Sequence, residues 1–280
     1  FVRRLRAGYC KAINPYSRQV YQIALDRASV DGFVFWTKNV QPFLRYLPEV
    51  QQRGFPFVVQ YTINDYPRAL EASVVDADRS VQTAVAVAEQ YGSRALVWRY
   101  DTIVSSSLTP ASYHVDSFGR LADRLAGATD EVVISFAQLY KKTTRHLNEA
   151  ASSHGFSWSD PPVEEKRSLV QQLVTIASSH GMRLSVCSQR DLLVPGAADA
   201  RCVDAERLAA LGAESRAKLK GNRKDCGCFE SRDIGDYDTC PHGCVYCYAV
   251  QDRRLAQERY RQHDPDSEFL FEPPSVSLVK

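Results

Sequence analysis

The sequence lacks any apolar run approaching the roughly 20 residues of a membrane span, and its start, Phe1 to Arg6, is too short and too charged for a signal peptide. It also lacks a strong net charge, because 35 basic residues stand against 33 acidic ones, for a formal charge of +2. This balance favours neither nucleic acid nor a membrane surface as a partner. We see no internal sequence repeat and no low-complexity segment. Together these absences predict a soluble, cytoplasmic protein.

Cysteine, by contrast, is plentiful and unevenly placed. The 280 residues include eight cysteines, and five of them lie between positions 226 and 247. Such crowding is typical of a metal site rather than of the disulfide framework of a secreted chain. With 44% hydrophobic residues, a chain of this length can bury a large core without disulfides.

Short apolar runs alternate with amphipathic helical patterns along most of the chain. The helical patterns end at glycines, and Pro48 is expected to kink or split the helix that follows Gln41. Residues 1–7 resemble the end of a helix that stops near Gly8. The predicted strands cover residues 33–37, 57–62, 96–101, 132–136 and 182–187, with a short one at 201–204; the predicted helices cover about 42–54, 81–92, 115–127, 160–181, 205–211 and 249–261.

This alternation predicts an α/β fold with a parallel sheet, either doubly wound or a full or partial TIM-like (β/α) barrel. We favour the barrel. We expect residues 1–214 to form it, with its first strand lying before Phe1. Residues 215–280 are then a cysteine-rich segment with a helix and a tail, folded over the mouth of the barrel.

Polar side chains follow the predicted strands. Lys38 and Asn39 follow the first strand, Tyr61 lies at the end of the second, and Arg99 and Asp101 end the third. Because the carboxyl ends of parallel strands carry the functional site in such folds, these residues are expected to line one mouth. For any one of them the alternative is an ordinary transition from strand to loop, and for Arg99 and Asp101 it is a mutual ion pair that braces the barrel.

The sharpest motif is Cys240-Pro241-His242-Gly243-Cys244-Val245-Tyr246-Cys247. Three thiols at this spacing suit three corners of a 4Fe-4S cluster and leave its fourth iron open. Tyr246 is expected to shield the cluster from water. The alternative is structural zinc, held by the two thiol pairs Cys226, Cys228, Cys244 and Cys247 or with His242 as a ligand.

The stretch from Cys240 to Ala249 resembles the signature of radical S-adenosylmethionine (SAM) enzymes. In its Tyr-Cys-Tyr-Ala form it is most similar to the spore photoproduct lyase and DNA repair photolyase branch, and the stretch from Phe35 to Asn39 is similar to a barrel strand of that branch. The whole chain resembles an uncharacterised, largely bacterial family whose C-terminal cysteines have been likened to these enzymes. One departure is the order, because radical SAM enzymes carry the motif after their first strand and this chain carries it after its last.

The resemblance implies a chemistry. Cys240, Cys244 and Cys247 would hold the cluster, and the open iron would chelate SAM, whose reductive cleavage normally yields a 5′-deoxyadenosyl radical that acts on a substrate, here unknown. Lys38 would pair with the SAM carboxylate, with Asn39, Tyr61 and Tyr246 as further cofactor contacts. Arg99 and Asp101 would bind polar groups of cofactor or substrate. An electron donor such as flavodoxin or ferredoxin is the implied partner.

Four further cysteines are left over. Cys187 ends a strand, Cys202 follows it, and Cys226 and Cys228 form a C-x-C pair in a polar loop. They could converge on a second metal, either an auxiliary iron-sulfur cluster or zinc. The alternative is that they are small apolar core residues, which is sufficient for Cys187 taken alone. A zinc-stabilised barrel without radical chemistry, perhaps one that binds nucleic acid, is the alternative reading of the whole protein.

Overall fold

The protein is built on one parallel sheet of six strands. The computed structural model describes residues 1–14, 17, 19–214, 217–221, 223 and 225–272. Every strand of the sheet is parallel to its neighbours, and the strands follow one another in chain order. They are β3 (Phe33–Thr37), β4 (Phe57–Thr62), β5 (Leu96–Ile103), β6 (Glu131–Phe136), β7 (Arg183–Val186) and β8 (Ala198–Asp199).

Helices fill most of the connections between the strands. None of the helices in the described part of the chain is long and apolar enough to cross a membrane. The α-helices are α1 (Val2–Ala7), α2 (Leu47–Gln52), α3 (Ala77–Tyr91), α4 (Ala111–Leu125), α5 (Lys141–His154), α6 (Val163–Ser179), α7 (Ala205–Ala210) and α8 (Arg253–Gln262), and the 3-10 helices are η1 (Gln41–Tyr46), η2 (Ser93–Ala95) and η3 (Arg190–Leu192).

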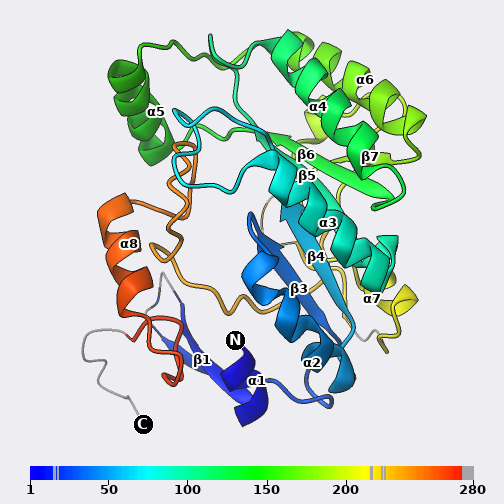
Figure 1. The fold of residues 1–280 in the computed structure, drawn as a ribbon, viewed down its shortest axis with the longest axis vertical. Helices are drawn as coiled ribbons and strands as arrows, with labels where there is room; N and C mark the ends of the chain where they lie inside the picture. Colours follow the sequence, from blue (N-terminus) through cyan, green and yellow to red (C-terminus); the bar gives the residue numbers. More distant parts are fainter. Residues whose placement is uncertain (15–16, 18, 215–216, 222, 224, 273–280) are drawn as a thin grey trace.

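Different parts of the chain cover the two faces of the sheet (Figure 1). One face, which includes Val59 and Trp98, packs against α3, α4 and α6 in the main hydrophobic core. The opposite face, which includes Val58 and Val97, packs against side chains from residues 200–229. Successive side chains of a strand alternate between the faces, so each strand contributes to both layers.

Two local signals act as the sequence predicts. Pro48 divides the helix after Gln41 into η1 and α2, because proline fits the first turn of a helix but not its interior. Gly8 ends α1 at φ 81°, in the left-handed region that glycine adopts without a steric penalty. The structure adds a cap that the sequence analysis does not predict: the Asp76 carboxylate caps α3 by accepting from the Arg79 N–H at 2.9 Å.

Three elements escape prediction from the sequence. The antiparallel hairpin of β1 (Tyr9–Ile13) and β2 (Val20–Ala24) is mostly half-buried, so its strands show little apolar alternation. Helix α5 buries few side chains and therefore carries a weak apolar stripe. Strand β8 lies a few residues before the predicted strand at 201–204, because Ala198 and Asp199 pair with β7.

The predicted parallel sheet is confirmed, but a closed barrel is not. Among the described residues, β3 and β8 do not pair with each other, so the sheet is open. A doubly wound sheet would reverse its strand order at a switch point, and no such reversal occurs between β3 and β8. The tail returns to the hairpin, where the Lys11 N–H donates to the Glu268 carbonyl at 2.8 Å; of the predicted tail, residues 273–280 lie outside the described residues.

A buried ion pair fastens α7 to the sheet. Arg207, 4% exposed, donates to Glu131 Oε2 at 2.7 Å and to Asp130 Oδ1 at 2.7 Å. Glu131, 3% exposed, also accepts from Ser185 Oγ at 2.6 Å. Arg183 also lies 3.2 Å from Glu131 Oε1, but its side chain is 58% exposed. Removing Arg207 therefore leaves the buried carboxylate with only a solvent-screened cation, which costs more than the pair itself contributes.

We therefore predict that Arg207→Ala lowers the free energy of unfolding by about 3–5 kcal/mol. Urea denaturation at neutral pH measures this loss. The control is Arg201→Ala, which removes a more exposed pair with Glu206 and should cost at most about 1 kcal/mol. Equal losses in the two variants would contradict the prediction.

Candidate functional site

The loop of residues 240–247 docks at the carboxyl edge of the sheet, beside β3 and β4. Cys244 forms an antiparallel bridge with Glu71, which lies in the loop after β4. The Val245 N–H donates to the Leu70 carbonyl at 3.0 Å. In Figure 1 this segment is orange and passes close to α5 before it enters α8. The structure therefore brings the C-terminal cysteines to the strand ends.

One carboxylate, that of Glu71, gathers the surrounding polar groups. Its side chain is 4% exposed, and its Oε1 accepts from Lys38 Nζ at 2.8 Å and from Asn64 Nδ2 at 3.1 Å. The same oxygen accepts from the Tyr246 hydroxyl. Lys38 Nζ also lies 5.7 Å from the centroid of the Tyr246 ring, within cation-π range. The end of β3, the loop after β4 and the cysteine loop thus meet at one buried charge.

The electrostatics of this group favour a charged lysine beside a neutral thiol. Burial alone would lower the pKa of Lys38, but the Glu71 carboxylate and the Cys244 thiol outweigh it, and the pKa is raised. Burial raises the pKa of Cys244 to about 12, and Lys38 acts in the opposite direction. Lys38 is therefore a cation placed to offset negative charge when Cys244 loses its proton.

Arg99 and Asp101 form the ion pair that the sequence leaves as an alternative to ligand binding. Arg99 Nε donates to Asp101 Oδ2 at 3.1 Å, and Arg99 Nη1 donates to Gln60 Oε1 at 3.2 Å and to Cys202 Sγ at 3.0 Å. Burial alone would raise the pKa of Asp101, but Arg99 and a hydrogen bond from Ser135 outweigh it, and the pKa is lowered. The carboxylate is therefore charged and held in place.

One residue expected at the mouth lies elsewhere, and another stays at the end of β3 but caps a turn there. Tyr61 is fully buried on the helix-covered face of β4, because Gln60 takes the neighbouring position on the opposite face. The prediction for Tyr61 is corrected: it packs in the main core. Asn39 caps the turn after β3, where its Oδ1 accepts from the Gln41 N–H at 3.2 Å. Of the predicted residues, Lys38 and Tyr246 meet at Glu71.

The three thiols of the loop have the donor set of an iron-sulfur site. Cys240, Cys244 and Cys247 come from one loop and lie within each other's electrostatic range. The Ala249 N–H donates to Cys247 Sγ at 3.4 Å, and backbone N–H bonds of this kind stabilise cluster sulfurs. Among the described residues, no three His, Cys, Asp or Glu side chains are arranged around a single metal ion. A cubane does not require that arrangement, since each thiolate binds a different iron.

The four other cysteines also gather, on the far side of Arg99. Cys187 Sγ lies 3.4 Å from Cys202 Sγ, and the Cys228 thiol hydrogen-bonds with those of Cys202 and Cys226. Cys228 therefore has Cys202 and Cys226 as neighbours, and the zinc alternative that joins Cys226 and Cys228 to the loop cysteines stays a prediction. All eight cysteines are free thiols.

Reasoning from the sequence misses Glu71 and Asn64. Asn64 follows β4 by two residues, so the rule that polar residues after strands belong to the site could have found it. Its Nδ2 also reaches the Asp101 carbonyl at 3.2 Å, and its Oδ1 accepts from the Asp101 N–H at 2.9 Å. Glu71 gives no such signal, because it lies in the middle of an irregular loop.

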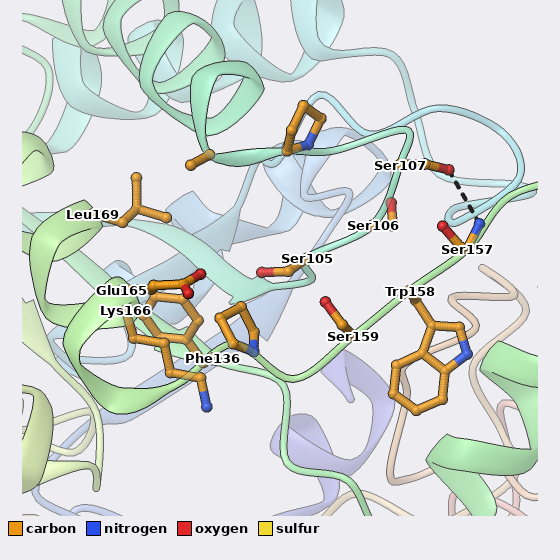
Figure 2. Close-up of a pocket in the computed structure, with 13 residues that line it drawn as sticks. Ser105, Ser106, Ser107, Phe136, Ser157, Trp158, Ser159, Glu165, Lys166 and Leu169 are labelled. Atoms are coloured by element: carbon orange, nitrogen blue, oxygen red, sulfur yellow. Dashed lines mark hydrogen bonds between the residues drawn. The ribbon is translucent and has the colours of Figure 1, made fainter.

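A cavity of about 250 Å³ lies between the loops after β5 and β6 and the start of α6 (Figure 2). Its lining includes Ser105 and Ser106 after β5, together with Trp158 and Lys166, and contains no cysteine. Hydroxyls of its lining hold the loops together: Ser106 Oγ lies 2.7 Å from Thr109 Oγ1, and the Ser157 N–H donates to Ser107 Oγ at 3.1 Å. We assign no ligand to this cavity.

Fold and site together define an α/β protein with an open parallel sheet whose carboxyl edge carries two groups of cysteines. The chain belongs to the family described as domain of unknown function DUF1848, which matches residues 1–249 and so includes all eight cysteines. No curated protein and no solved structure matches the chain. The expected membership of an uncharacterised family is confirmed, whereas the relation to spore photoproduct lyase stays a prediction.

We predict that Glu71→Gln loosens the docked cysteine loop. Hydrogen bonds to a charged group contribute about 1.5–3 kcal/mol, so the Val245 amide should exchange its hydrogen about 10- to 100-fold faster. Hydrogen exchange read by mass spectrometry or NMR measures this rate. The control is Glu89→Gln on the exposed side of α3, which should leave the rate unchanged. Unchanged protection in Glu71→Gln would show that Glu71 does not hold the loop.

Proposed function

We propose that the protein is a radical SAM enzyme whose 4Fe-4S cluster is held by Cys240, Cys244 and Cys247, acting on a substrate still to be identified. The observation that carries the proposal is the docking of this loop beside Lys38 and Glu71 at the strand ends. In parallel α/β folds, that edge is where cofactors bind.

The docking also offers an answer to the unusual order of the motif. In the enzymes that the sequence resembles, the cysteine loop follows the first strand. Here it comes last in the chain, yet it contacts the end of β3 through Lys38 and the loop after β4 through Glu71. We propose that the open sheet with its sequential strand order acts as part of such a barrel, with the loop returned to its first strands.

When bound, the cluster would supply the electron that cleaves a carbon-sulfur bond of SAM. The chain's own residues bind and orient. Lys38 would bind the carboxylate of SAM, and Tyr246 would cover the cluster, since its ring packs edge-on against Tyr66 at 5.9 Å. Cys240, at the exposed end of the loop, leaves an approach for an electron donor such as flavodoxin or ferredoxin.

Arg99 and Asp101 are placed to complete the polar end of the site. Asp101 lies within the electrostatic range of Lys38, and its carboxylate also accepts from Ser135 Oγ and, at 3.2 Å, from Thr102 Oγ1. We propose that the pair positions the cofactor or the substrate from the centre of the sheet, while Lys38 and the cluster act at its β3 edge.

Anaerobic preparation tests the assignment. Loaded protein should contain iron and sulfide, give the electron paramagnetic resonance signal of a reduced 4Fe-4S cluster, and cleave SAM when reduced. 5′-Deoxyadenosine would indicate the usual radical, and methylthioadenosine would indicate transfer of the aminocarboxypropyl group. Zinc at full occupancy without iron, or no SAM cleavage after confirmed cluster loading, would overturn the proposal. Cys244→Ala should abolish both the signal and the cleavage.

We predict that Lys38→Met weakens SAM binding to the loaded protein by about 10- to 100-fold, because one charge-assisted hydrogen bond contributes about 1.5–3 kcal/mol. Calorimetry or the SAM-dependent change in the spectrum of the cluster measures the affinity. Iron content should stay close to that of the wild type, since Lys38 is not a ligand. The matched control is Lys141→Met, at an exposed position of α5, and an affinity for SAM that is equal in both variants would exclude the role of Lys38.

A further inference from the structure

A second group of thiols lies apart from the loop of residues 240–247. It consists of Cys187 after β7, Cys202 after β8, and the C-x-C pair Cys226 and Cys228. We propose that these four cysteines form a zinc site, bound as a tetrathiolate and independent of the proposed cluster.

The geometry points to one site because four thiols from three separate segments form a continuous row. Cys187 Sγ lies 3.4 Å from Cys202 Sγ, the Val203 N–H next to Cys202 donates to Cys228 Sγ, and both Cys202 and Cys226 are close enough to Cys228 to shift the pKa of its thiol. Cys187, Cys202 and Cys228 are each less than 9% exposed. Packing alone would place single thiols among apolar side chains, as it does for Cys10 in the main core.

The surroundings suit the negative charge of bound thiolates. The Val203 N–H donates to Cys228 Sγ at 3.4 Å, and Arg99 Nη1 donates to Cys202 Sγ at 3.0 Å. A metal bound by four thiolates carries excess negative charge, and donors to the ligand sulfurs stabilise it and fix the ligands.

In the loop that carries the C-x-C pair, the backbone at Gly221 packs closely against the backbone of Cys226. A Cβ atom on Gly221 would lie 2.2 Å from the Cys226 carbonyl oxygen, far inside van der Waals contact. Only glycine therefore allows this close approach of the two backbone segments, and the approach fixes the position of Cys226. Gly221 thus gives a means of moving one thiol without removing it.

The spacing of the sulfurs favours two thiolates on one tetrahedral metal ion over the corners of a cubane, and analysis for iron and sulfide separates zinc from a 2Fe-2S cluster. With Zn–S bonds of about 2.3 Å, the sulfurs of a tetrahedral site stand about 3.8 Å apart. The 3.4 Å between Cys187 and Cys202 is close to this value, whereas the corners of a cubane are wider apart. As they lie, the thiols form a row and not a shell, and the described residues hold no three ligands around one point. Binding therefore requires rotation of the outer thiols about their Cα–Cβ bonds, with loss of their protons.

The test uses the Cys240→Ala, Cys244→Ala, Cys247→Ala triple variant of the full chain, in which the proposed cluster cannot form. We expect this variant to retain about one zinc per chain and to show thiolate-to-cobalt charge-transfer absorption when titrated with Co²⁺. Adding Cys226→Ser and Cys228→Ser should lower zinc affinity at least about 100-fold and abolish the absorption. Gly221→Ala should weaken zinc binding although all four thiols remain.

The control is Cys10→Ser in the same triple variant, which should keep full zinc binding. Circular dichroism checks that each variant folds, and zinc should raise the melting temperature of the triple variant but not that of the variant lacking Cys226 and Cys228. Absence of zinc from the folded triple variant, equal zinc affinity with and without Cys226 and Cys228, or iron with sulfide in place of zinc would each overturn the proposal. None of these outcomes depends on whether the loop cysteines hold a cluster.

Discussion

The site is organised by the Glu71 carboxylate, which is buried and therefore needs hydrogen-bond donors and a cation around it. Glu71 is withdrawn from water, and an ionised carboxylate in that position is stable only when cations and hydrogen-bond donors surround it. Its donors are Lys38, Asn64 and Tyr246, which come from the end of β3, the loop after β4 and the cysteine loop. Burying the Glu71 carboxylate costs free energy unless these donors surround it. This requirement favours contact between segments that are nearly 200 residues apart in the chain.

The parallel sheet places further charged and thiol side chains along the same edge as Lys38. Because all strands run in the same direction, their carboxyl ends share one edge. Lys38 follows β3, Arg99 lies in the middle of β5 beside the end of β4, and Cys187 follows β7, so all three lie toward that edge. Arg99 and Asp101 occupy the middle of the row: Arg99 contacts Cys202 of the second thiol group, and Asp101 feels the charge of Lys38. The ion pair therefore lies between the second thiol group and Lys38.

The sequence predicts what periodicity and local chemistry encode. The five long strands, the division at Pro48 and the gathering of polar residues at strand ends follow from apolar runs, proline geometry and strand polarity. The prediction for Tyr61 is wrong because a motif at the end of a strand does not determine which of two adjacent residues faces the site. Tyr61 packs in the main core, and Gln60 lies on the opposite face, where it contacts Arg99. Glu71 is not predicted because its role depends on a contact with Tyr246. No local sequence pattern indicates a contact between residues so far apart in the chain.

Lys38 and Arg99 differ in how many of their N–H donors are already used, and this difference indicates different roles for the two cations. An ammonium carries three N–H donors and Glu71 takes one at 2.8 Å, so a second carboxylate can bind Lys38 without displacing Glu71. Arg99 instead uses Nε and Nη2 on Asp101 and divides Nη1 between Gln60 and Cys202. A ligand at Arg99 would have to displace a buried carboxylate and would strand its charge, at a cost of several kcal/mol. These contacts favour Lys38 as the residue that meets a ligand directly, and the intact Arg99–Asp101 pair as the group that fixes the polar end of the site next to it.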